Sequence, residues 1–129
     1  RFRHLNSICR ANKITANQTL TTNVITAINF TSETIDTDAI HDNVTNNTRF
    51  TAPIAGKYLA AGGVIFANAV AASGTQHLVG VRANGTTILA QDRQVSVNGF
   101  ATYLNAWAVV SLAAGEYGGV MARLQSGMF

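Results

Sequence analysis

Three aspartates in one polar segment are the residues whose type and spacing could bind a metal ion. Asp36, Asp38 and Asp42 fall within seven residues, and carboxylate oxygens are the ligands that calcium prefers. The segment lacks the glycine and the closing glutamate of a calcium-binding loop. Aspartates in such loops also accept hydrogen bonds from their own backbone. Calcium is therefore the one cofactor that the sequence suggests, and backbone capping is the alternative.

The histidines and the cysteine give no catalytic pattern. The chain has three histidines and one cysteine, and none stands in a zinc-protease, paired-cysteine or nucleophile-elbow motif. His41 lies beside the aspartates, where it would either pair with a carboxylate or remain solvated. Cys9 cannot form a disulfide within one copy of the chain, and we expect it to act as a small hydrophobic side chain. The sequence thus predicts a protein that is not an enzyme.

Five aromatic residues at strand spacing are candidates for the core or for an interface between subunits. Hydrophobic residues make up 47% of this chain of 129 residues, which is more apolar surface than one small domain can hide. This excess predicts self-association. The alternative role, for Tyr58, Tyr103, Trp107 and Tyr117, is a platform that binds sugars. The five residues are Tyr58, Phe66, Tyr103, Trp107 and Tyr117.

The first eight residues form an expected basic arm that precedes the folded domain. Arg1 and Arg3 stand among Phe2, Leu5 and Ile8, a mixture that suits the rim and the core of a protein interface. With a net charge of +3, such an arm could also bind phosphates, but nothing in it indicates the reading of bases. We therefore expect the arm to dock on a neighbouring protein and not on nucleic acid.

The elements that must position these residues are predicted to be strands. Between residues 12 and 51, apolar residues arrive singly among Thr and Asn, which fits short strands and loops. The run from 57 to 66 is apolar on both faces, which predicts a central strand of a sandwich. Asn84-Gly85 separates the runs 76–83 and 86–90 and supplies the positive φ angles that a tight hairpin turn requires.

The last third of the chain shows the clearest alternation of apolar and polar residues. A short strand is expected at 93–97, and a long strand at 100–112 would carry Tyr103, Trp107 and Val109 on one face. A turn at 113–115 then leads to a strand at 118–125. Many short strands at this spacing predict an all-β fold, either a sandwich or a jelly roll.

The order of motifs resembles the complement globular-head (C-one-q) and tumour-necrosis-factor family, in its bacterial and phage branch. The resemblance covers roughly residues 9–127, and the acidic segment 30–42 is similar to one that many phage-encoded members carry. Its motifs are Asn17-Gln18-Thr19, FTSETIDTDAIHD at 30–42, FTAPIAGKY at 50–58, Asn84-Gly85 and LAAGEYGGV at 112–120.

The resemblance implies an all-β jelly-roll sandwich of two antiparallel sheets, with about ten strands, over residues 9–129. It also implies a compact homotrimer. Members of the family have a final apolar strand after the position of Gly127, and this chain shows only Met128-Phe129 there. A missing strand would leave backbone groups unpaired in the inner sheet. We therefore expect either a continuation beyond Phe129 or an added strand from another chain, in preference to the basic arm.

The resemblance also implies a function in a virus particle. We expect a structural protein on the virion surface of a bacteriophage, which decorates the capsid or forms the tip of a fibre or tail. Its partners would be further copies of itself and a capsid, fibre or tail protein. The alternative is a secreted or cell-surface module that binds glycans or proteins of a host. Membrane insertion is not expected, because no apolar run approaches the roughly 18 residues that a spanning helix needs.

Overall fold

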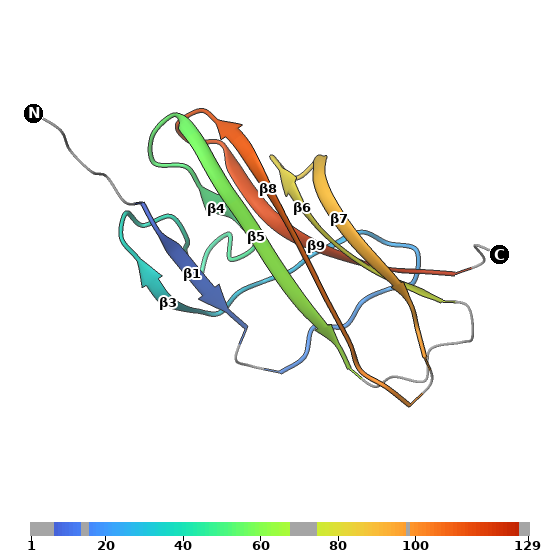
Figure 1. Cartoon of the computed structure of the whole chain (residues 1–129). Coiled ribbons are helices and arrows are strands. Elements are labelled where there is room, and N and C mark those ends of the chain that lie inside the picture. Colours follow the sequence, from blue (N-terminus) through green and yellow to red (C-terminus); the bar gives the residue numbers. More distant parts are fainter. Residues whose placement is uncertain (1–6, 14–15, 68–74, 98, 127–129) are drawn as a thin grey trace, which may run out of the picture.

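The computed structural model describes residues 7–13, 16–67, 75–97 and 99–126. In this part of the chain it shows nine antiparallel strands and no helix, so the predicted all-β sandwich is confirmed (Figure 1). The strands are β1 (Cys9–Asn12), β2 (Thr26–Ala27), β3 (Ser32–Asp36), β4 (Phe50–Thr51), β5 (Gly56–Phe66), β6 (Gln76–Ala83), β7 (Thr87–Val95), β8 (Thr102–Leu112) and β9 (Tyr117–Gln125). Within those same residues, no helix has the length and apolar character needed to cross a membrane.

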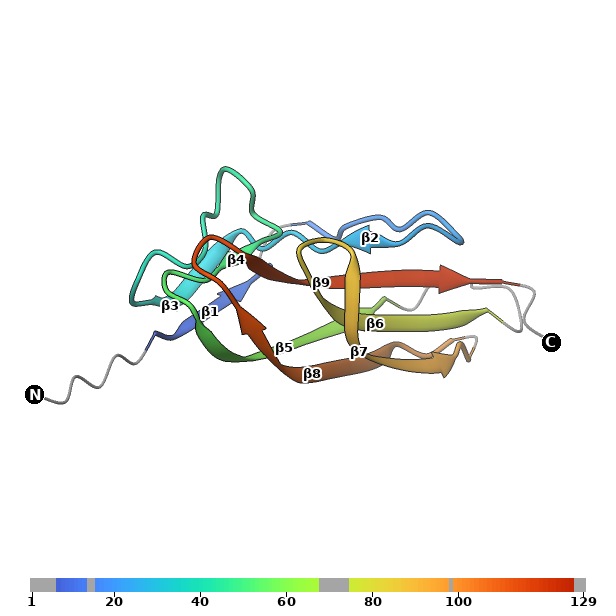
Figure 2. The same cartoon turned by 90° about the horizontal axis from the view of Figure 1, so that it is seen from above.

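The strands are arranged in two layers with a jelly-roll-like order. One layer has the order β2-β9-β6-β7, and the short β4 also pairs with β9. The other layer contains the long β5–β8 pair, with the β1–β3 ribbon to one side of it (Figure 2). The layers approach each other closely where β8 runs along β7. On the opposite side, β5 faces β1 with no hydrogen-bonded ladder between them among the described strands.

The predicted hairpin turn between β6 and β7 is confirmed. Asn84 and Gly85 both have positive φ, at 52° and 71°, and the Thr86 N–H donates to the Ala83 carbonyl at 3.1 Å. Two consecutive positive φ angles are what a type I′ turn requires, and its twist matches that of the flanking strands. The local sequence is therefore sufficient to set this connection.

The turn between β8 and β9 also agrees with the sequence. Gly115 has a φ of 87°, and the Glu116 N–H donates to the Ala113 carbonyl at 3.1 Å. The Glu116 carboxylate accepts the Ala113 N–H at 2.7 Å and the Asn84 side-chain amide at 2.8 Å. These hydrogen bonds lower the pKa of Glu116. They also tie the two turns together at one end of the sandwich.

Three strand predictions need correction. The run 57–66 was expected to be central, but β5 pairs with β8 alone among the described strands, and alternate side chains on it are exposed. The expected strands 86–90 and 93–97 form one continuous strand, β7. The polar residues between them lie on an exposed edge strand, so they do not interrupt it. The strand expected from residue 100 begins at Thr102. Apolar side chains on both faces of a strand indicate that burial of both faces would be favourable. They do not show whether another part of the same chain covers each face.

The core between the layers is built from side chains that alternate inward from β5, β6, β8 and β9. Val79 and Val81 of β6 pack with Leu104 of β8 and Val120 of β9, and each is at most 4% exposed. Phe66 closes this cluster at the end of β5. These contacts join residues from strands that are not neighbours in the same sheet, and they hold the two layers together.

His77 is a buried histidine at the edge of this core. Its ring stacks on that of Phe66, with centroids 4.4 Å apart and an interplanar angle of 7°. Its Nδ1 is buried without a hydrogen-bond partner among the described atoms. Burial therefore lowers the pKa of His77, because the charged imidazolium would lose its hydration.

We expect the protein to lose stability as the pH falls below about 6.5, and the His77→Phe variant to lose less. In that range the unfolded chain binds a proton at residue 77 and the folded chain does not, so the free energy of unfolding decreases. Phenylalanine keeps the stack on Phe66 and cannot titrate. Thermal melting at about pH 7 and about pH 5.5 measures the difference. Equal pH dependence in both proteins would contradict the prediction.

Candidate functional site

The outward side of the β5–β8 pair exposes several large apolar side chains on one surface. The two strands pair without a register shift, so that Leu59 lies opposite Val109 and Ile65 lies opposite Tyr103. Trp107, opposite Ala61, is 65% exposed. We call this surface the outer face. It consists of Leu59, Ala61, Gly63, Ile65, Tyr103, Asn105, Trp107 and Val109.

The outer face contains no charged side chain. Lys57, at the start of β5, is the nearest cation on the same side of that strand. A Cβ atom placed on Gly63 would lie 2.5 Å from the Tyr103 hydroxyl, so the tyrosine side chain occupies the space above this glycine. An uncharged patch with exposed Trp, Tyr, Leu and Ile side chains is typical of an interaction surface.

The five predicted aromatic residues do not form one site. Phe66 is buried in the core, whereas Tyr103 and Trp107 are exposed on the outer face. Tyr58 is half-buried, and its hydroxyl donates to the Ile54 carbonyl at 2.6 Å. Tyr117 is half-buried beneath the Arg49 guanidinium, which lies 4.3 Å from the ring centroid. Only Tyr103 and Trp107 are therefore placed to contact a partner through the outer face.

Sequence reasoning missed the contribution of β5 to the outer face. Leu59 and Ile65 are 70% and 69% exposed and belong to the same surface as Trp107. A signal was present, because the odd-numbered residues from 59 to 65 share one face of a strand. The signal was ambiguous, since the even-numbered residues of this run are apolar as well.

The acidic segment uses its carboxylates on its own backbone and on a neighbouring hydroxyl. Asp36 accepts the N–H groups four and five residues later, at 2.7 and 2.9 Å. Asp42 accepts two further N–H groups, at 2.9 and 3.0 Å, and these bonds lower its pKa. Asp38 accepts a hydrogen bond from the Ser7 hydroxyl. No group of three or more His, Cys, Asp or Glu side chains that could hold a metal ion occurs in the part of the chain that the structure describes.

His41 is buried and paired with a carboxylate, which is the first of the two environments expected for it. Its Nδ1 lies 2.8 Å from a carboxylate oxygen of Glu33, and its Nε2 lies 3.0 Å from the Asn47 carbonyl. Its ring packs beside those of Phe30 and Phe50, with centroids 6.3 and 4.8 Å away. His41 therefore fastens β3 to the loop before β4 and has a structural role.

The basic arm falls almost wholly outside the described residues. Arg1, Phe2, Arg3 and Leu5 are not described, so their predicted docking role stays a prediction. Ile8 is 49% exposed and is hydrogen-bonded twice to Thr37. Its N–H donates to the Thr37 side-chain hydroxyl at 3.0 Å, and its carbonyl accepts the Thr37 backbone N–H at 3.1 Å. The chain therefore enters β1 alongside the segment that follows β3.

Cys9 is half-buried on β1, and its environment opposes ionisation. Burial raises the pKa of the thiol to about 11, and the nearby negative charges of Asp36 and Glu33 act in the same direction. The thiolate is the nucleophilic form of cysteine. A reactive role for Cys9 therefore has no support in the geometry.

We expect Cys9 in the folded protein to react with iodoacetamide about two orders of magnitude more slowly than in the unfolded chain at about pH 8. The cause is the smaller thiolate fraction of the folded protein. Mass spectrometry of samples quenched over time, with and without urea, measures the two rates. Similar rates in both conditions would show that the thiol is not protected.

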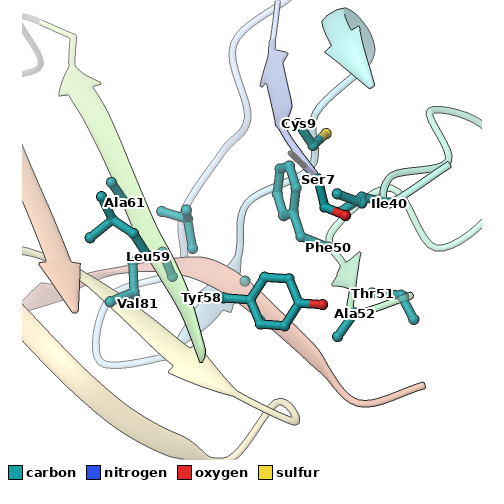
Figure 3. A pocket seen from close by; sticks show the side chains of 14 residues that line it. Ser7, Cys9, Ile40, Phe50, Thr51, Ala52, Tyr58, Leu59, Ala61 and Val81 are labelled. Atoms are coloured by element: carbon teal, nitrogen blue, oxygen red, sulfur yellow. The ribbon is translucent and has the colours of Figure 1, made fainter. Parts of the chain in front are cut away.

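A hollow of about 140 Å³ opens between β1 and β5 (Figure 3). Cys9 of β1 and Phe50 of β4 line one side of it, and Tyr58 and Ala61 of β5 line the other. Its remaining walls reach across to residues 118–120 of β9 in the other layer. None of the described residues that line this hollow is charged. We call it the slot.

Comparison with known proteins adds no relative. A scan against models of protein families matches none of them, and a search of curated proteins finds no similar sequence. The outer face and the slot are therefore interpreted from their own chemistry.

Proposed function

We propose that this protein is a non-enzymatic structural protein that assembles with copies of itself into a homotrimer through the outer face. The single observation that carries the proposal is the row of exposed apolar side chains on β5 and β8, with no charge among them. Burying such a surface releases about 25 cal/mol per Å² of apolar area. Around a threefold axis, each uncharged face can lie against its neighbours without leaving a charge unpaired.

The proposed setting is the surface of a bacteriophage virion, as a capsid decoration protein or at the tip of a fibre or tail. The support is the resemblance of the sequence to the phage branch of the complement-head and tumour-necrosis-factor family. The motif at 50–58 runs from β4 into β5, and the motif at 112–120 runs from the end of β8 into β9. The partners would be a capsid, fibre or tail protein, with the basic arm as the docking element.

A second candidate function is a secreted or cell-surface module that binds a host glycan or protein. The observation in its favour is that Tyr103 and Trp107 are both exposed on one sheet face, 61% and 65% respectively. Exposed aromatic rings on a rigid strand can stack on the apolar side of a sugar. If neighbouring copies instead cover the outer face, a sugar cannot reach these two rings. The outer face therefore cannot serve both functions at once.

Size-exclusion chromatography with light scattering on the purified protein tests the first proposal. We expect the mass of three chains, and the mass of one chain over a range of concentrations would refute self-association. Mass spectrometry of purified virus particles and of host membranes then tests the setting. Detection of the chain in membranes and not in particles would favour the second candidate.

A further inference from the structure

The layer formed by β2, β9, β6 and β7 carries four arginines on its outward side. Even-numbered side chains of β6 point away from the core, because Val79 and Val81 point into it. The register places Arg93 of β7 and Arg123 of β9 on either side of Leu78, on this outward side. We call this surface the arginine face. Its arginines are Arg49, Arg82, Arg93 and Arg123.

No carboxylate balances the charge of the arginine face. The chain has six acidic residues, and all of them are described. Four lie in the segment 33–42, and Glu116 accepts hydrogen bonds at the turn between β8 and β9. Asp92 follows the alternation of β7 and lies on the opposite side from Arg93. Within the described part of the chain, none of the four guanidinium groups has an ion pair or a hydrogen bond.

The arginines are held against the sheet. Arg82 and Arg123 are half-buried, and the Arg49 guanidinium lies over Tyr117, an odd-numbered residue of β9 like Arg123. Leu78 is only 4% exposed although it points outward. This low exposure is expected where arginine stems cover apolar surface and leave their charged ends in water. Side chains that are already ordered lose less conformational freedom when a partner binds.

The composition of the arginine face favours the carboxylates of a protein over the phosphates of a nucleic acid. All four cations are arginines, which are enriched in protein interfaces, whereas lysine is depleted there. The planar guanidinium can bind a carboxylate through two parallel hydrogen bonds. Single-stranded nucleic acids stack on exposed aromatic rings. Tyr117 is half-buried beneath Arg49, and no other Phe, Tyr or Trp occurs in β2, β6, β7 or β9.

We propose that the arginine face docks on an acidic segment of another protein, whose carboxylates pair with the guanidinium groups. The acidic segment 33–42 of a second copy of this chain does not suit this role. Each of its four acidic side chains already accepts a hydrogen bond within its own chain. The inference does not depend on trimer formation, because the arginine face and the outer face belong to different layers.

Fluorescence anisotropy of a labelled acidic peptide, titrated with the whole protein, tests the inference. The probe peptide alternates Glu and Ser, and its neutral counterpart alternates Gln and Ser. We expect the probe to bind at low ionic strength and the neutral peptide not to bind. Arg93→Gln and Arg123→Gln should each weaken binding of the probe about fivefold or more, because each removes a charge-assisted pair of hydrogen bonds.

Arg10→Gln is the matched control. It removes the same charge from an exposed position on β1, in the other layer. We expect it to change the affinity for the probe by less than about twofold, because distant exposed charges are screened by salt. Circular dichroism checks that each variant keeps its strand signal. If the half-buried Arg123 cannot be replaced without loss of the fold, the exposed Arg93 still decides the outcome.

Each alternative gives a different result. Absence of binding, or equal weakening by Arg10→Gln, would overturn the inference. Tighter binding of an oligothymidylate of equal charge, or of phosphatidylserine vesicles, would overturn it if that binding is lost in Arg93→Gln, since the partner would then be a nucleic acid or a membrane. Light scattering on the same samples separates this inference from the proposed trimer. Single chains that bind the probe would refute the trimer alone, and trimers that do not bind it would refute the docking role alone.

Discussion

Replacing Trp107 by aspartate is expected to convert the proposed three-chain assembly into single folded chains. Trp107 is 65% exposed on one chain, so little of its side chain packs within its own fold. Covering that exposed part in an interface stabilises association by about 2–4 kcal/mol per subunit. Aspartate removes this gain and adds a charge that would be buried without a partner. Light scattering after size exclusion measures the mass, and far-ultraviolet circular dichroism checks the fold.

The Gln94→Asp variant is a matched control for this experiment. Gln94 is an exposed residue of β7, outside the outer face, and the substitution adds the same charge. We expect this variant to keep the mass of the unmodified protein. If Trp107→Asp also keeps that mass, the outer face is not the interface. If Trp107→Asp loses its strand signal, the less drastic Trp107→Ser decides whether association or folding was affected.

Two neighbouring glycines of β5 are expected to respond differently to alanine. Gly62 faces the core, where an added Cβ would overlap the side chain of Val120, which is 4% exposed. Because the overlap is with a buried side chain in the opposite layer, Gly62→Ala should lower the free energy of unfolding by about 1–3 kcal/mol. Urea denaturation of the variant and the unmodified protein measures this loss.

Gly63→Ala is the control, because its added Cβ points to the outer face. The atom would lie 2.5 Å from the Tyr103 hydroxyl, at the far end of an exposed side chain that can swing away. We expect a change in stability within about 1 kcal/mol but weaker self-association, since Tyr103 is displaced. An equal loss of stability in both variants would show that the two faces of β5 are not distinguished as the structure describes.

The sequence by itself determined the features that depend on residues a few positions apart. Asn84-Gly85 predicts its turn because few other residue pairs adopt two consecutive positive φ angles. Period-two alternation over residues 100–112 predicts a strand with Tyr103, Trp107 and Val109 on one side, and the observed strand has these side chains on one side but begins at Thr102. Together with the spacing of the other strands, these local signals were enough for the all-β sandwich.

Only the tertiary structure decided which apolar faces are covered. The run 57–66 is apolar on both sides, and pairing with β8 alone leaves one side exposed and one edge open among the described strands. The carboxylate that pairs with His41 is Glu33, eight residues away, and the ring that stacks on His77 is that of Phe66, eleven residues away. Such contacts depend on the order and register of strands. A strand's own sequence specifies the two faces of its side chains, whereas burial depends on what the rest of the chain places against each face.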